Sequence, residues 1–113
     1  MPYKYDDAWH RKQRAFIKRK VRSRRLNPDT VEQYEMWLPQ AWELLGRPAP
    51  TEPTLQQLEN LEADWPVSEN SKASRLTVVR AFLRWAGCKA ALEWEIQSQA
   101  QPKQDRQYLS DTA

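Results

Sequence analysis

The sequence predicts an all-α protein, a small bundle of four or five helices in a single domain. Two glycines among 113 residues are too few for the tight turns of an all-β domain. Apolar side chains recur at helical spacing in four successive segments, and residues that favour helix starts or stops lie between them. These observations favour helices along most of the chain.

The first predicted helix spans residues 6–25. Trp9 and Phe16 share a narrow apolar stripe, with Ile17 and Val21 beside it. Acidic residues at the start of this helix and arginines at its end suit the helix dipole. Because the stripe is too narrow to fold alone, we expect this helix to pack on the rest of the chain.

The second predicted helix spans residues 28–45. Asn27 is a suitable cap, Pro28 suits the first helical position, and Gly46 is a natural stop. Pro39 lies inside this segment, so we expect it to kink the helix or to split it in two.

Two further helices are predicted after a proline-rich connector. Thr54 caps a third helix over residues 55–63, and Ser71 caps a fourth over residues 72–86, which Gly87 ends. A fifth, shorter helix is predicted from Lys89 to about Ser98, carrying Leu92 and Trp94. The expected core comprises Tyr34, Leu38, Leu58, Leu76, Val79, Phe82 and Leu83.

Charge is distributed unevenly along the chain. Residues 1–25 contain ten Lys or Arg and two Asp, a net charge of +8, whereas the other 88 residues hold eight basic and thirteen acidic side chains, a net charge of −5. A basic segment of this kind suggests an anionic partner, and nucleic acid is the leading candidate because Lys and Arg neutralise phosphates. The alternative is a basic helix that is merely solvated.

The residue types needed for catalysis or cofactor binding are scarce. His10 and Cys88 are the single histidine and cysteine, so no zinc set or nucleophile–base pair is recognisable. We therefore expect no cofactor, no metal, no small-molecule substrate and no enzyme activity from this chain alone. We also expect Cys88 and most of the six tryptophans to belong to the core. The acidic clusters, expected to be solvated helix faces, are Glu59, Glu62 and Asp64, and Glu93 and Glu95.

The fourth predicted helix carries cations and no acid between Lys72 and Lys89. Its start combines hydroxyls with positive charge at the positive end of the helix dipole, which suits phosphate or base contacts. A helix that only carries surface charge is the alternative. The predicted DNA-contacting residues here are Ser71, Lys72, Ser74 and Arg75 at the start, and Arg80 and Arg84 on the exposed face.

Two runs in the sequence carry a resemblance to a known family. Residues 25–34 (RLNPDTVEQY) are similar to the junction of the first two helices in the core-binding domain of tyrosine recombinases, the phage-integrase family. Residues 74–86 (SRLTVVRAFLRWA) are similar to the last major helix of that domain. Residues 54–58 (TLQQL) resemble its short third helix, and residues 102–111 resemble the linker that follows it.

The resemblance implies a SAM-like helical bundle over residues 1–99 that contacts one side of a recombination site, with residues 100–113 as a linker towards a catalytic domain outside this chain. The implied partners are double-stranded DNA and other recombinase protomers. With no apolar run near the roughly 18 residues of a membrane span and no secretion signal, we expect a cytoplasmic protein without a membrane partner. DNA contacts at the first helix junction are expected from Arg24, Arg25, Asn27 and Thr30.

Two other functions remain open from the sequence. One is a helical protein-interaction module whose acidic second and third helices bind a basic partner. The other is a stand-alone nucleic-acid-binding adaptor. Salt-dependent DNA binding distinguishes the first of these from the recombinase and adaptor hypotheses.

Overall fold

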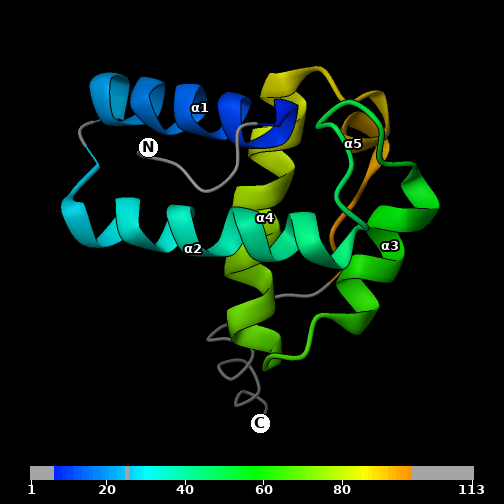
Figure 1. Ribbon diagram of the computed structural model, residues 1–113. Helices are drawn as coiled ribbons and strands as arrows, with labels where there is room; N and C mark the ends of the chain where they lie inside the picture. Colours follow the sequence, from blue (N-terminus) through cyan, green and yellow to red (C-terminus); the bar gives the residue numbers. More distant parts are fainter. Residues whose placement is uncertain (1–6, 25, 98–113) are drawn as a thin grey trace, which may run out of the picture.

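The computed structural model describes residues 7–24 and 26–97, and these residues form five helices and no strand (Figure 1). The all-α prediction is confirmed. The predicted linker over residues 100–113 and Arg25 lie outside the described residues. No described helix is both long and apolar enough to cross a bilayer. The helices are α1 (Ala8–Arg24), α2 (Pro28–Leu44), α3 (Leu55–Asp64), α4 (Glu69–Ala86) and α5 (Lys89–Glu93).

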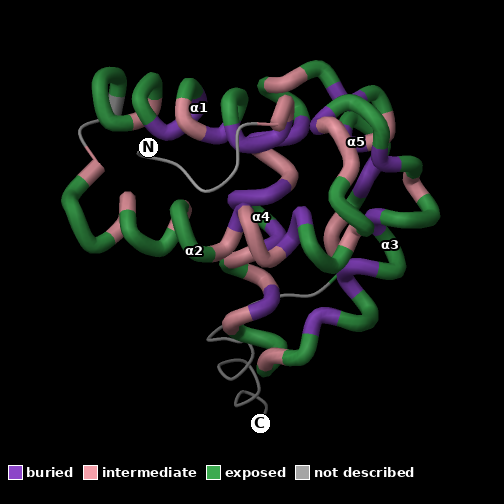
Figure 2. The backbone as a smooth tube through the Cα atoms, viewed as in Figure 1, coloured by how far each residue is buried: buried purple, intermediate pink, exposed green. Residues whose placement is uncertain are grey.

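Helix α4 lies at the centre of the bundle. Helices α1 and α2 run antiparallel and pack on one side of α4, while α3 and α5 pack against each other on the other side (Figure 1). The buried residues lie along α4 and on the faces of the other helices that are turned towards it (Figure 2). This arrangement leaves the outer faces of α1 and α3 to solvent.

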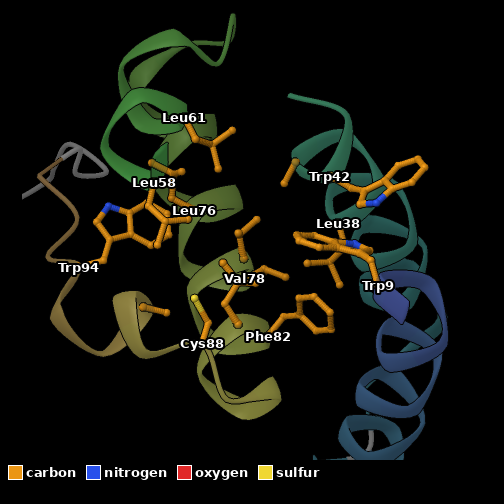
Figure 3. Packing of buried hydrophobic residues seen from close by; sticks show 14 of the residues in the cluster. Trp9, Leu38, Trp42, Leu58, Leu61, Leu76, Val78, Phe82, Cys88 and Trp94 are labelled. Carbon is orange, nitrogen blue, oxygen red and sulfur yellow. The ribbon is translucent and has the colours of Figure 1, made fainter. Parts of the chain in front are cut away.

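The core is aromatic on its α1 side. Phe82 of α4 lies with its ring centroid 5.1 Å from that of Trp9 and 5.5 Å from that of Phe16. On the other side of α4, Trp94 lies beside Leu58 (Figure 3). Six of the seven predicted core residues are fully buried, and the seventh, Tyr34, packs half-buried at the edge. Cys88 is buried as predicted, and so are four tryptophans, Trp9, Trp42, Trp65 and Trp94.

The predicted starts of the first two helices are largely confirmed. Asp7 caps α1 by accepting from the backbone N–H of His10, so the described helix begins at Ala8 rather than at residue 6. Partial burial acts to raise the pKa of Asp7, but hydrogen bonds and charge from His10 outweigh it and hold that pKa below its usual value. Asn27 caps α2, its Oδ1 accepting from the Thr30 N–H at 2.9 Å, as predicted.

Helix α2 is a single helix, so of the two outcomes expected at Pro39, a kink or a split, the split is wrong. Proline removes one N–H, and within a helix that N–H would bond the carbonyl four residues earlier, that of Glu35. Glu35 is exposed, and water can therefore reach the carbonyl that has lost its donor. The helix thus continues through Pro39 to Leu44.

Two predicted boundaries are wrong. Helix α4 is capped by Ser68, whose Oγ accepts from the Ser71 N–H at 3.3 Å, so Ser71 lies in the first turn and does not cap. Helix α5 ends at Glu93, five residues before the predicted end. It stops because Trp94 adopts an extended backbone that directs its indole into the core. The caps predicted at Thr54 and Gly87 are confirmed.

The cap of α4 can be tested with a matched pair of serine variants. We expect Ser68→Ala to lower the free energy of unfolding by about 1 kcal/mol, because it removes the side chain that satisfies a free N–H. This corresponds to a fall in Tm of roughly 4–8 °C. Ser71→Ala removes no cap and places alanine inside a helix, so its Tm should stay equal or rise slightly. Equal losses from both substitutions, measured by thermal denaturation, would contradict this assignment.

Candidate nucleic-acid interface

Helix α1 is the most basic helix of the described chain. Eight Lys or Arg and no acidic residue occupy its 17 positions. Trp9, Phe16 and Ile17 face the core, and the opposite face therefore points to solvent. Three exposed cations follow one another along that face at spacings of seven and four residues and span roughly 16 Å of helix axis. They are Arg11, Lys18 and Arg22, with exposed Arg19 beside them.

Other cations of α1 lie beside aromatic rings at the border with the bundle. The ammonium group of Lys12 lies 5.6 Å from the ring centroid of Trp85, and that of Lys20 lies 5.6 Å from the ring centroid of Phe16. These distances allow cation–π attraction. The basic character of α1 thus extends around the helix to the edge of α4.

Lys72, a predicted DNA contact, lies in acidic surroundings. Only 7% of the residue is exposed, and its Nζ is 3.6 Å from an Oε of Glu69. It lines a pocket of about 650 Å³ between α3, α5 and the start of α4. The pocket is therefore unfavourable for a phosphate group. The other polar residues that line it are Glu59, Glu62, Glu69, Glu93, Glu95 and Gln97.

Arg75, the other favoured residue at the start of α4, packs between two tryptophans. Its guanidinium carbon lies 5.4 Å from the ring centroid of Trp37 and 5.8 Å from that of Trp65. Its Nη1 donates to Oε1 of Gln40 at 2.9 Å. Arg75 therefore joins α4 to α2 and to the end of α3, and the DNA contact predicted for it stays a prediction.

The remaining predicted contacts are dispersed. Arg84 donates through Nε to the Ala91 carbonyl at 2.7 Å and so stabilises the end of α5. Arg80 is half-buried, and Ser74 is exposed. Ser71 takes part in the cap of α4 through its N–H. The structure thus distributes these four residues along α4.

The second predicted group lies where α1 ends and α2 begins. Asn27 and Thr30 hydrogen-bond to each other in the cap of α2. Arg24 is the last residue of α1, and Arg25 is outside the described part of the chain. Asn27 and Thr30 therefore lie close to the end of α1, whereas the start of α4 lies away from that end (Figure 1).

One acidic residue departs from the prediction of solvated faces. Glu62 is buried, and its carboxylate accepts from Nε1 of Trp94 at 3.3 Å and from the N–H of Gln97 at 2.7 Å. The carboxylate connects α3 to the segment after α5. The sequence carries a signal for this difference: Glu62 lies four residues after Leu58 and seven after Leu55, within the apolar stripe of the helix, whereas Glu59 lies at its flank.

The residues that sequence reasoning missed are the outward cations of α1. The predicted sites were placed at the end of α1, at the start of α2 and on α4, although the stripe through Trp9 and Phe16 already indicates which face of α1 is outward. Among the described residues, no group of three or more His, Cys, Asp or Glu is arranged to hold a metal ion. No family model, curated protein or solved structure matches this chain.

Proposed function

We propose that this chain is a DNA-binding domain that contacts the phosphates of double-stranded DNA along the outer face of α1. The observation that carries the proposal is a 17-residue helix with eight cations, no acid, and an exposed basic face. Cations at this spacing release counterions when they neutralise phosphates, which drives association without reading the base sequence.

The finer proposal is the core-binding domain of a tyrosine recombinase or integrase. It is supported by the resemblance of residues 25–34 and 74–86, which here contain the start of α2 and most of α4. Such a domain covers one side of a recombination site beside other protomers, in the cytoplasm, and is inert without a catalytic domain. The reading frame beyond Ala113 distinguishes this proposal from a stand-alone DNA-binding adaptor.

A second candidate function is favoured by the acidic pocket between α3 and α5. Five glutamates around one lysine suit a basic partner protein, as the protein-interaction hypothesis requires. Under this alternative the basic face of α1 would serve only solubility. Salt-dependent DNA binding by α1 would then be absent.

Substitutions on α1 test the DNA-binding proposal. We expect the combined variant Lys18→Gln, Arg19→Gln, Arg22→Gln to flatten the plot of log K against log salt by nearly three units, at about 0.9 per lost phosphate contact. All duplex sequences should weaken alike. The affinity is measured by fluorescence anisotropy at several salt concentrations, beginning near 50 mM, where specific and non-specific contacts are both strong.

A single matched pair controls for net charge. Lys18→Gln and Lys72→Gln remove the same charge, one from the outer face of α1 and the other from the acidic pocket. We expect only the first to weaken DNA binding. Equal affinity of the triple variant and the parent, or no binding at all at low salt, would favour the protein-interaction hypothesis.

A further inference from the structure

Trp85 is an exposed aromatic residue at the border of the basic face. It is the most exposed of the six tryptophans, with 38% of its surface accessible. It lies near the end of α4, where α4 passes the first half of α1 (Figure 1). Its ring centroid is 5.5 Å from that of Phe16, with a 50° angle between the planes, and the Lys12 ammonium lies 5.6 Å from the same centroid.

Trp85 is partly exposed, whereas nearby residues on α4 belong to the buried core. Phe82 and Leu83, its neighbours on α4, are fully buried, and Phe82 already packs against the rings of Trp9 and Phe16 of α1. The buried Phe16 ring holds one part of the indole in place. Trp85 is therefore a positioned aromatic surface with a cation beside it.

Aromatic side chains next to cations are the elements with which proteins hold single-stranded nucleic acid, the ring stacking on a base and the cations contacting the backbone. A fully paired duplex offers its base faces only at its ends, so a stacking site of this kind needs an unpaired base. We infer that the ring of Trp85 stacks on an unpaired base of a DNA strand, while Lys12 contacts the backbone beside that base. The adjoining duplex lies along α1. This inference rests on the proposed function, because α1 supplies the phosphate contacts.

The inference predicts a preference for interrupted duplexes. We expect the parent protein to bind a duplex with a short single-stranded thymine gap more tightly than the same duplex fully paired. Trp85→Ala should lose roughly 5- to 150-fold in affinity for the gapped DNA, the range that follows from base–aromatic stacking energies. Affinity for the paired duplex should change by less than about twofold, because phosphate contacts are retained.

Two control variants separate stacking from general effects. Trp85→Phe keeps an aromatic face and should retain most of the preference. Leu92→Ala alters a more exposed apolar residue on α5, 65% accessible, and should leave both affinities unchanged. Far-UV circular dichroism establishes that each variant is folded before titration.

Photocrosslinking tests the same site in the unaltered protein. With 5-iodouracil in the gap, we expect the crosslink on Trp85, in the tryptic peptide of residues 85–89 that follows cleavage after Arg84 and Lys89. A crosslink elsewhere, or equal affinity of Trp85→Ala and the parent for gapped DNA, overturns the inference about Trp85. If the protein still binds duplex DNA through α1, the proposed function stands. Failure to bind either DNA overturns both.

Discussion

Replacing Phe82 with alanine is expected to lower the free energy of unfolding by about 3–5 kcal/mol, the usual cost of removing a buried phenyl ring. The ring is fully buried and contacts the rings of Trp9 and Phe16, so it connects α4 to α1. These large rings cannot easily move into the vacated space, and a cavity should remain. Since a domain of this size is stabilised by only about 5–15 kcal/mol, the loss is a large part of the total.

Urea denaturation followed by far-UV circular dichroism measures the effect of Phe82→Ala. Leu92→Ala is the matched control, because it also shortens an apolar side chain but in an exposed position, and should change stability by less than about 0.5 kcal/mol. A loss below about 1 kcal/mol for Phe82→Ala would mean that this face of α4 is not the inner one.

Replacing Trp94 with alanine is expected to cost a similar amount, about 3–5 kcal/mol. The indole is fully buried against α3 and α4, and its Nε1 donates to Glu62. The substitution therefore leaves a cavity and also removes a hydrogen bond from a buried carboxylate. We expect Trp94→Phe, which keeps a ring but loses the donor, to cost about 1–3 kcal/mol.

Hydrogen exchange separates the contribution of the Glu62 carboxylate from that of the packed Trp94 ring. The Gln97 N–H donates to the other oxygen of Glu62 at 2.7 Å, so its protection reports on the carboxylate directly. Glu62→Ala should abolish the protection at Gln97, and Trp94→Phe should retain part of it. Full protection at Gln97 in Glu62→Ala would show that this contact does not position the segment after α5.

The sequence predicts those parts of the fold that depend on neighbouring residues. The caps at Asn27, Thr54 and Gly87 are read correctly because each depends on a side chain or backbone conformation within one helical turn. The start of α4 is locally ambiguous, since both Ser68 and Ser71 can cap. The end of α5 depends on the contact between Trp94 and Glu62, which lies 32 residues earlier in the chain, and periodicity does not reveal it.

In the candidate site, too, features set by neighbouring residues can be predicted from the sequence and features set by distant residues cannot. The sequence identifies cations, but their environment depends on other segments. Lys72 and Arg75 share a favourable position at the start of α4, yet glutamates surround the first and two tryptophans enclose the second. On α1 the buried stripe through Trp9 and Phe16 defines the outward face without any distant partner. The basic face of α1 could therefore have been predicted from the sequence, and the role of Arg75 in packing could not.

The basic helix and the acidic pocket lie on opposite sides of α4, and this separation of charge gives the described part of the molecule an electric dipole moment. Close to any polyanion, the field exerts a torque that turns α1 towards it and the α3–α5 side away, before the surfaces touch. The range of this torque follows the Debye length, about 30 Å at 0.01 M salt and about 8 Å at physiological salt. At low ionic strength the protein therefore meets a polyanion already oriented, and at physiological salt it orients only within about 8 Å of the polyanion.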